Sequence, residues 1–408
     1  MPKSGGAAIR MQKEFGDVTF LVGNESILSN SEDIPALPIF STQAIDFLAE
    51  LSDDLLHNRE AKKYGDIITY AFWIRRRSLE GLKTEYSNEK GRIGRGISFQ
   101  ITPSNIPVQF AISMTYSLIA GNISLIRLSS KEFEQVNIIC GAINRVISEK
   151  CPELQNYICI MRYDRSSDIT QILSDRCDIR MIWGGDNTIN HIRRFSVQPR
   201  CIDLGFADRF SISVIDSDYY LKTDHRVIAT DFYNDTYYTD QNACSSTRLV
   251  VWTGNRIDEA KEIFWSCLKD EVQSKYRLND ISGSEKLLKT ALCAIDHPEI
   301  RELRENNAIV RVEIPRLYDD IMQYKGNSGY FFEYETDNIE SILPLLKKGC
   351  QTVTFLGDGL EDRLRELVTT SGVRGVDRIV LMGHSMDLSL VWDGYDMPIT
   401  LSRVISNR

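Results

Sequence analysis

The segment ISFQITPSNIPVQFAISMTYSLIAGNISLIRLSS, residues 97–130, alternates between two patterns of apolar residues. Its apolar runs at 97–102 and 123–128 predict strands, because short apolar runs bounded by turn residues are typical of buried strands. Residues 107–120 between them predict a helix with Pro107 in its first turn, where the missing N–H is not needed. A strand, a helix and a second strand in this order predict a βαβ unit of a parallel sheet.

The same alternation continues beyond residue 130. Ser129-Ser130-Lys131-Glu132 has the pattern of a capping box, which predicts that a helix begins there. Further strands are predicted at 157–161, 180–183 and 210–215, and helices at 169–173 and 188–195. Repeated βαβ units predict a Rossmann-type parallel sheet, which binds ligands at the carboxyl ends of its strands.

The rhythm of the sequence changes after residue 222, which predicts a second α/β domain. The chain before this point, 1–222, is expected to form the first domain, with a mostly helical start that includes helices at 46–56 and 61–82. The second domain is expected to span 223–384. Its elements are a long helix at 257–276 and strands at 248–252, 308–313, 330–334, 352–356 and 378–382. The tail, 385–408, is expected to pack back on the first domain or on another subunit.

Composition and charge restrict the class of protein. The 408 residues are 42% hydrophobic and 26% charged, as in ordinary globular proteins, and the net charge of -9 argues against a nucleic-acid partner. The longest apolar stretch, 108–120, is too short to span a membrane, and residues 1–6 lack an apolar signal core. Nine scattered cysteines without metal-binding spacing predict no metal site and a reducing, cytoplasmic location.

Cys244 lies in the stretch DQNACSS, residues 240–246, among small and amide-bearing residues. A thiol in such a setting is a candidate covalent nucleophile. The alternative is structural, because an unpaired cysteine most often serves as a small buried apolar residue. The stretch by itself leaves both interpretations open.

Three loops at predicted strand ends are candidate binding elements. The loop 102–107 contains Asn105, which could donate to an oxyanion or cap the following helix. The loop 126–131 carries hydroxyls and two cations, which suit a phosphate or a solvated helix start. The loop 183–186 contains two glycines, which permit close approach of a ligand but also occur in ordinary turns.

Five motifs occur in an order that is similar to that of the aldehyde dehydrogenase superfamily. They are Asn105-Ile106-Pro107, Ala120-Gly121-Asn122 followed by Arg127, Gly184-Gly185, Asp203-Leu204-Gly205 and Asn242-Ala243-Cys244. The sequence most closely resembles the acyl-CoA reductases, a branch that includes the fatty-acid reductase of bacterial bioluminescence. The resemblance covers residues 95–408. It implies an aldehyde-dehydrogenase-like α/β fold, with a Rossmann-type cofactor domain and a second α/β catalytic domain.

The resemblance also implies a role for each matching residue. Cys244 would be the nucleophile, and Asn105 with the main-chain N–H of Cys244 would hold the oxyanion. Asp203 stands where many members have a glutamate that acts as a general base. The implied cofactor-binding residues are Thr102, Arg127, Ser130, Lys131, Gly184 and Gly185.

Two departures from the superfamily pattern bear on the reaction. Asp203-Leu204-Gly205-Phe206 replaces Glu-Leu-Gly-Gly, which weakens the case for activating a hydrolytic water, whereas reduction of a thioester needs no such water. Ser130 and Lys131 stand where NAD-preferring members carry a glutamate that binds the ribose hydroxyls. A serine and a lysine favour a 2′-phosphate, so the expected cofactor is NADPH.

The resulting hypothesis is NADPH-dependent reduction of an acyl thioester to an aldehyde through an acyl-cysteine at Cys244. The acyl group, which could be a fatty acyl chain, would arrive on CoA or on a carrier protein. An acyl-protein synthetase or acyltransferase is a candidate partner, and a homo-oligomer is expected. The alternatives are an aldehyde dehydrogenase that forms an acid, and a non-catalytic scaffold for an acyl-transfer partner.

Overall fold

The computed structural model describes residues 15–406 and divides the chain into two α/β units. The first unit comprises the chain up to Ala207 and again from Leu388, and the second comprises Asp208–Asp387. Residues 1–6, on which the expected absence of a signal segment was based, lie outside the described residues. Within residues 15–406, none of the helices combines the length and the apolar character needed to cross a membrane.

The first unit is built on a six-stranded sheet in the order β1-β5-β4-β3-β6-β7. All neighbouring strands are parallel except β1, which pairs antiparallel with β5. The strands are β1 (Thr19–Val22), β3 (Ile97–Ile101), β4 (Ile123–Arg127), β5 (Ile158–Arg162), β6 (Ile179–Trp183) and β7 (Ile202–Phe206). The chain order reverses between β3 and β6, which is where Rossmann-type sheets bind ligands at their carboxyl edge.

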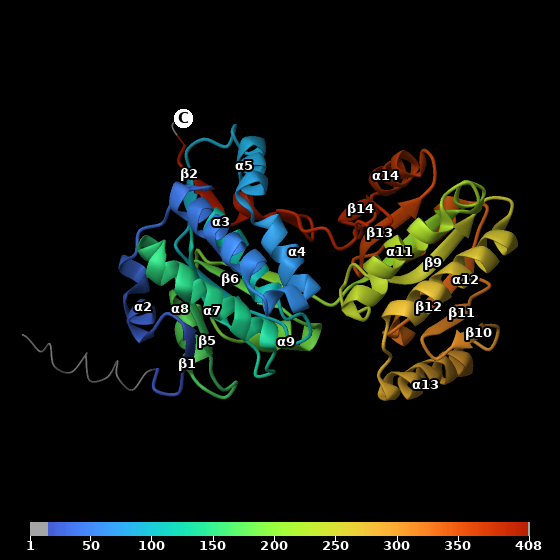
Figure 1. The fold of residues 1–408 in the computed structure, drawn as a ribbon, viewed down its shortest axis with the longest axis horizontal. Coiled ribbons are helices and arrows are strands. Elements are labelled where there is room, and N and C mark those ends of the chain that lie inside the picture. The colour runs from blue at the N-terminus through green and yellow to red at the C-terminus, as the bar shows by residue number, and fades with distance from the viewer. Residues whose placement is uncertain (1–14, 407–408) are drawn as a thin grey trace, which may run out of the picture. The chain divides into compact units, whose positions relative to one another are not determined.

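Helices cover this sheet, and α3, α4 and α7 lie in front of its strands in Figure 1. The helices are α2 (Glu25–Asn30), α3 (Thr42–His57), α4 (Gly65–Trp73), α5 (Arg76–Glu85), α6 (Gln109–Ile119), α7 (Glu134–Glu149), α8 (Ile169–Arg176) and α9 (Asp186–Ile192). Helix α6 is buried along its whole length. An all-round buried helix between two buried strands explains why residues 97–130 are so uniformly apolar.

The C-terminal tail belongs to the first unit. Strand β17 (Ser402–Val404) pairs antiparallel with β2 (Arg92–Gly94), and the short helix α15 (Met397–Thr400) precedes it. Strands β15 (Val391–Trp392) and β16 (Tyr395–Asp396) form a two-residue hairpin. Its turn residues have φ values of 48° and 76°, the left-handed pair that a tight hairpin turn requires.

The second unit contains a seven-stranded sheet in the order β10-β11-β12-β9-β8-β13-β14, in which only β10 is antiparallel. The strands are β8 (Phe210–Asp216), β9 (Thr247–Thr253), β10 (Arg301–Asn306), β11 (Ile309–Glu313), β12 (Tyr330–Glu335), β13 (Cys350–Leu356) and β14 (Arg378–Leu381). The helices are α10 (Ser217–Tyr220), α11 (His225–Thr236), α12 (Ile257–Lys275), α13 (Asp280–Asp296) and α14 (Leu360–Ser371). The predicted α/β class with parallel sheets is thus confirmed.

The division between the units falls at residue 207, whereas the sequence placed it at 222. The difference comes from β8, which was grouped with the first sheet. In the structure β8 pairs with β9 and β13, two strands that follow much later in the chain. An apolar strand pattern does not indicate which sheet the strand joins, because that choice rests on long-range hydrogen bonds.

Two predicted details are wrong. The capping box at Ser129–Glu132 does not open a helix: α7 begins at Glu134, after Phe133, and has no side-chain cap. The single helix predicted at 61–82 is interrupted, because Arg75 adopts an extended conformation with ψ of 150° and Ile74 is fully buried.

Gly121 and Asn122, which belong to one of the family-like motifs, serve the fold. Gly121 has φ of +86°, and a Cβ atom there would lie 1.9 Å from the carbonyl oxygen of Leu37. The Asn122 side chain accepts hydrogen bonds from the N–H groups of Arg95 (2.7 Å) and Gly96 (3.1 Å) and donates to the carbonyl of Leu401 (2.9 Å). This turn therefore fastens the C-terminal tail to the strand that leads into β3.

We expect Gly121→Ala to lower the free energy of unfolding by about 3 kcal/mol or more. The left-handed conformation costs a residue with a side chain ~1–2 kcal/mol, and overpacking adds roughly 1–3 kcal/mol. Urea unfolding measures the loss. Gly185→Ala is the matched control, because its φ is negative and its added Cβ would have no described atom within 4 Å. Equal stability of Gly121→Ala and the wild type would contradict this account.

Candidate active site

The first candidate site lies at the carboxyl edge of the first sheet, where β3 and β4 end side by side. Thr102 follows β3, and both its N–H and its hydroxyl donate to the carbonyl oxygen of Arg127, each at 3.1 Å. These bonds hold the two strand ends together. Thr102 therefore has a visible structural role at the edge where a ligand is expected.

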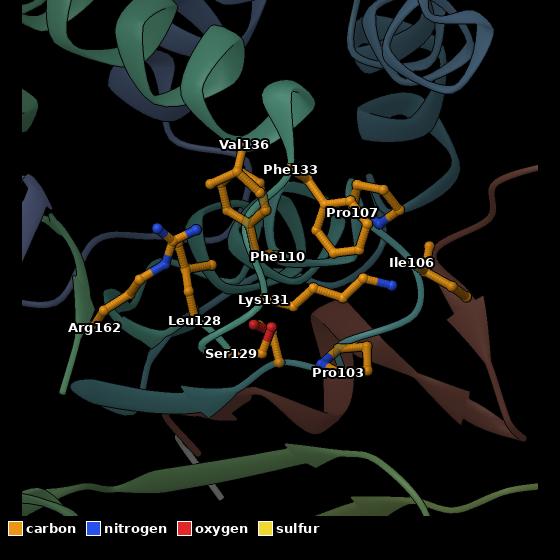
Figure 2. Close-up of a pocket in the computed structure, with 11 residues that line it drawn as sticks. Pro103, Ile106, Pro107, Phe110, Leu128, Ser129, Lys131, Phe133, Val136 and Arg162 are labelled. Atoms are coloured by element: carbon orange, nitrogen blue, oxygen red, sulfur yellow. The ribbon is translucent and has the colours of Figure 1, made fainter. Parts of the chain in front are cut away.

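A shallow pocket lies at this edge (Figure 2). It combines apolar side chains with two hydroxyls and two cations. Its lining consists of Thr102, Pro103, Ile106, Pro107, Phe110, Leu128, Ser129, Lys131, Phe133, Val136 and Arg162. The Lys131 ammonium lies 4.7 Å from the ring centre of Phe133, so the cation is held against the apolar wall.

Arg162 is a pocket residue that the sequence analysis missed. It ends β5, and its Nε and Nη2 atoms are buried without a hydrogen-bond partner among the described residues. Its nearest carboxylate, Glu132, is exposed and lies 3.7 Å from Nη1. Unused buried donors beside Lys131 suit an oxyanion such as a phosphate. The sequence signal was an arginine directly after a predicted strand, at the edge that binds ligands.

Two of the predicted cofactor residues, Arg127 and Ser130, do not line the pocket, whereas Lys131 does. Arg127 is buried, donates to the carbonyl of Tyr163 at 3.4 Å and packs 4.9 Å from the ring centre of that tyrosine. Burial lowers the pKa of Arg127. Ser130 is exposed on the loop after β4. Neither residue is among those that line the pocket.

Gly184 and Gly185 follow β6, on the other side of the point where the strand order reverses. The N–H of Gly184 donates to the carbonyl of Phe206 at 3.2 Å, and Gly185 caps helix α9. The protein itself does not require a glycine at 185, since a Cβ there would enter open space. A glycine without a packing reason at a ligand-binding edge is consistent with close approach by a ligand.

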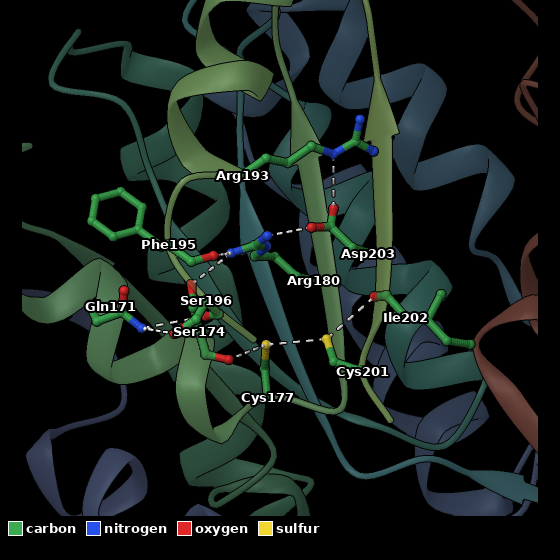
Figure 3. Close-up of polar contacts among 10 residues, drawn as sticks. All are labelled: Gln171, Ser174, Cys177, Arg180, Arg193, Phe195, Ser196, Cys201, Ile202 and Asp203. Atoms are coloured by element: carbon green, nitrogen blue, oxygen red, sulfur yellow. Dashed lines mark hydrogen bonds and ion pairs between the residues drawn. The ribbon is translucent and has the colours of Figure 1, made fainter. Parts of the chain in front are cut away.

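Asp203 is held by two arginines (Figure 3). It lies on β7, a strand that the sequence analysis did not predict, and pairs with Arg180 of the neighbouring strand β6. Arg180 is almost fully buried and also donates to the carbonyl of Phe195 at 2.8 Å, while Arg193 lies 3.5 Å from the second carboxylate oxygen. The Asp203 carboxylate is thus engaged in compensating the buried guanidinium of Arg180.

Phe206 accounts for the lost glycine of the Asp203–Phe206 motif. Its ring stacks on Trp183 at a centroid distance of 3.8 Å and an interplanar angle of 9°. The edge of Tyr395, from the tail hairpin, lies 6.0 Å away. The aromatic side chain at this position thus packs the end of β7 against β6 and against the tail.

Asn105 is exposed on the loop between β3 and α6. The alternative that it caps the helix is wrong, because α6 begins at Gln109 after Val108 and has no side-chain cap. Among the described residues the Asn105 amide makes no hydrogen bond. It lies in the same loop as Thr102 and belongs to the first unit, whereas Cys244 belongs to the second.

Cys244 is half-buried on the loop that leads into β9. Its carbonyl oxygen accepts a hydrogen bond from the Ser211 hydroxyl at 2.7 Å. The loop begins with Asp240 and Gln241, whose φ values of 54° and 56° are left-handed. Two consecutive non-glycine residues in this region cost roughly 1–3 kcal/mol each and are typical of functional loops.

The Gln241 side chain stabilises this strained loop. Its amide nitrogen donates to the carbonyls of Thr247 (2.9 Å) and Tyr330 (3.1 Å). Its amide oxygen accepts from the N–H groups of Gly329 (2.7 Å) and Tyr330 (3.1 Å). The fully buried amide therefore joins the starts of β9 and β12 and fixes the position from which the thiol loop extends.

Comparison with known proteins identifies the family. The family model for acyl-CoA reductase (LuxC) matches residues 24–278, more than half of the chain. The chain belongs to this family. It is 23% identical over 328 residues to a long-chain acyl-protein thioester reductase of Photorhabdus luminescens, and 23% identical over 163 residues to one of Aliivibrio fischeri. These matches cover 76% and 40% of this chain, but only 63% and 33% of the relatives.

Solved aldehyde dehydrogenases share the fold of this acyl-CoA reductase family member. An NAD-dependent benzaldehyde dehydrogenase from Corynebacterium glutamicum superposes with a TM-score of 0.66 at 12% identity, covering 93% of this chain and 86% of the other. Aldehyde dehydrogenase 21 of Physcomitrella patens gives 0.63 at 13%, covering 87% and 80%. The expected aldehyde-dehydrogenase-like fold is thereby confirmed.

We expect Asp203→Asn to destabilise the protein by about 3 kcal/mol, because removing one partner of a buried ion pair costs roughly 3–5 kcal/mol. Urea unfolding measures the loss. Asp186→Asn is the control, since Asp186 is exposed in the first turn of α9 and its change should stay within about 0.5 kcal/mol. A loss no larger than that of the control would mean that Asp203 is not needed to compensate Arg180.

Proposed function

We propose that the protein reduces a long-chain acyl thioester to the aldehyde, with Cys244 as the nucleophile and NADPH as the reductant. The observation that carries the proposal is a half-buried cysteine on a strained, rigidly held loop in a chain of the acyl-CoA reductase family. The names of the relatives support a long-chain acyl group bound to a protein as the substrate.

The environment of Asp203 favours reduction over oxidation of an aldehyde to an acid. Oxidation needs a base that activates water to hydrolyse the acyl-enzyme. Asp203 stands at the position of that base, but its carboxylate is bound by Arg180 and Arg193. Because the Asp203 carboxylate is engaged by these arginines, we expect slow hydrolysis of the acyl-cysteine, which then persists long enough to be reduced.

The chemistry that we assign to the chain begins at Cys244. Its thiolate attacks the thioester carbonyl, the bond to the donor thiol breaks, and the acyl group is left on Cys244. Asn105 and the main-chain N–H of Cys244 are the proposed donors to the oxyanion, a type of contact that contributes ~3–4 kcal/mol in comparable sites. When bound, NADPH would supply the hydride for reduction of the acyl group. Cleavage of the carbon–sulfur bond then releases the aldehyde and restores Cys244.

The pocket at the end of β4 supports NADPH as the cofactor. Its cations, Lys131 and Arg162, suit a 2′-phosphate, and the unused donors of Arg162 are consistent with an anion there. Among the solved structures with this fold, a 3,6-anhydro-L-galactose dehydrogenase is in complex with NAP. We assign the ribose and phosphate end of the cofactor to this pocket, and the pyrophosphate to the glycines at 184 and 185.

The acyl donor is the remaining part of the proposal. The relatives are named for acyl-protein thioesters, so a protein-bound acyl group is the preferred donor and acyl-CoA the simpler one. An acyl-protein synthetase or an acyltransferase would then supply the donor. A homo-oligomer is part of the same proposal.

Cys244→Ala should abolish acyl-dependent oxidation of NADPH, with a loss of at least about a thousandfold, because the variant lacks the thiol that is proposed to carry the acyl intermediate. The assay follows NADPH absorbance with myristoyl-CoA and other acyl-CoA donors. In a second measurement, radiolabelled acyl-CoA without NADPH should label the wild type and leave Cys244→Ala unlabelled. Cys267→Ala, another half-buried cysteine of the second unit, is the control and should retain activity. Activity that survives in Cys244→Ala would disprove the proposal.

Arg162→Gln and Lys131→Gln should each raise the KM for NADPH about tenfold, since a hydrogen bond to a charged group contributes ~1.5–3 kcal/mol. The KM for NADH, which lacks the phosphate, should change little. Arg165→Gln removes an exposed cation of the same unit that does not line the pocket and should leave both values unchanged. Parallel shifts for NADPH and NADH would argue against a phosphate site.

A further inference from the structure

Arg248 is a buried cation without an acidic ion-pair partner. It stands at the start of β9, four residues after Cys244, and its side chain is 5% exposed. Among the described residues no carboxylate lies within ion-pair distance of its guanidinium, and its Nε atom has no hydrogen-bond partner. A buried charge without compensation is costly, so a compensating negative charge is expected nearby.

The guanidinium joins the Cys244 loop to a second loop. Nη2 donates to the carbonyl of Gln241, the second of the two left-handed residues. Nη1 donates to the carbonyl of Gly326 and to the side-chain oxygen of Asn327 (2.7 Å). Asn327 in turn donates to the side chain of Asn242 at 2.7 Å. All acceptors of Arg248 are neutral, so these bonds fix its position without neutralising its charge.

The Cys244 thiolate is one of the negative charges that favour the charged form of Arg248. Burial lowers the pKa of Arg248 to about 10, and the Cys244 thiolate opposes this shift more strongly than Asp208 or Asp240. Asp208 is compensated by Lys325 at 2.8 Å, whereas Asp240 accepts a hydrogen bond from the neutral Tyr276 and keeps its negative charge near Arg248. Lys286, a second buried cation near this loop, donates to the carbonyls of Ser328 and Asn307.

We propose that Arg248 is the positioning residue of the nucleophile, holding the Cys244 loop through Gln241 and Asn327 while its uncompensated charge stabilises the Cys244 thiolate. This inference rests on the proposed role of Cys244. Deprotonation sends the thiol proton to solvent and leaves a negative charge that Arg248 can compensate. The electrostatic attraction between the two groups is mutual. The free energy by which the thiolate stabilises the charged form of Arg248 therefore equals the free energy by which the guanidinium stabilises the thiolate.

The competing interpretation is that Arg248 only clamps the two loops. A clamp would affect the stability of the fold and the geometry of the loop, but not the acidity of the thiol. The pH dependence of Cys244 reactivity therefore separates the two interpretations, and it can be measured without substrate or cofactor.

The test is the pH profile of Cys244 alkylation by iodoacetamide in Arg248→Met, followed by mass spectrometry of the peptide that contains Cys244. We expect the midpoint to rise by about one pH unit relative to the wild type, because an opposite charge nearby lowers an acidic pKa by roughly 1–3 units. Arg311→Met is the matched control. Arg311 is a buried arginine of the same unit that pairs with Glu333 (3.3 Å), and its loss should leave the midpoint unchanged. An unchanged midpoint in folded Arg248→Met would overturn the proposal.

A second comparison keeps Arg248 unchanged, so it can be made even if Arg248→Met does not fold. Cys244→Asp places a permanent negative charge at the thiol position, and Cys244→Asn is its neutral counterpart. We expect Cys244→Asp to melt at a higher temperature than Cys244→Asn at pH 7. Because the pKa of the new carboxylate would be depressed in the folded state, this advantage should disappear as the pH falls through that pKa. Equal melting temperatures at pH 7 would overturn the proposal.

Failure of this inference and failure of the proposed function give different results. If Cys244 is not acylated by labelled acyl-CoA, the proposed function fails whatever the alkylation profile. If Cys244 is acylated but its alkylation midpoint does not depend on Arg248, only the inference about Arg248 fails.

Discussion

The hydrogen-bonded amide of Gln241 is the constraint on which the candidate nucleophile depends. Its four contacts tie the starts of β9 and β12 together and hold two consecutive left-handed residues in place. A leucine or methionine of similar size would leave buried N–H and carbonyl groups without partners, at roughly 1–3 kcal/mol each. The stability of the second sheet therefore maintains the strain of the Cys244 loop. A rigid loop is what a nucleophile needs, because misplacement of the attacking atom slows the reaction.

Motifs shared with a large superfamily do not all retain the role that the superfamily gives them. Gly121 and Asn122 are explained by packing alone, since Gly121 packs against the carbonyl of Leu37 and Asn122 fastens the tail through Leu401. Asp203 occupies the position of a general base, yet its carboxylate is committed to the buried Arg180. Gly185 is the opposite case, because nothing in the first unit requires a glycine there. The glycine that the fold does not need is the better candidate for contact with a ligand.

The sequence predicted the parts of the fold that follow from local pattern. The strands and the helix within 97–130 are confirmed because each is a continuous apolar run with clear turn residues at its ends. The sheet to which β8 belongs was missed because it is set by pairing with strands far along the chain, and the break at Arg75 and the true start of α7 were missed as well. The site divides in the same way. Cys244 and the glycines of the β6 turn stand out in the sequence, whereas Arg162 and Arg248 become candidates only when their burial and unused donors are known.

The buried arginines of the chain differ in how their charges are compensated, and this difference carries functional information. Arg180 and Arg311 each face a carboxylate, Asp203 and Glu333 respectively, so their positive charges are neutralised within the fold. Arg248 has only neutral acceptors. Arg127 in the first unit is also buried with a carbonyl acceptor, so an acidic partner is usual but not required for a buried guanidinium. Because Arg248 has no acidic ion-pair partner, its positive charge can stabilise a negative charge that exists only at some stages of a reaction. The thiolate of Cys244 is such a charge, since it is lost when the thiol is acylated and returns when the product leaves.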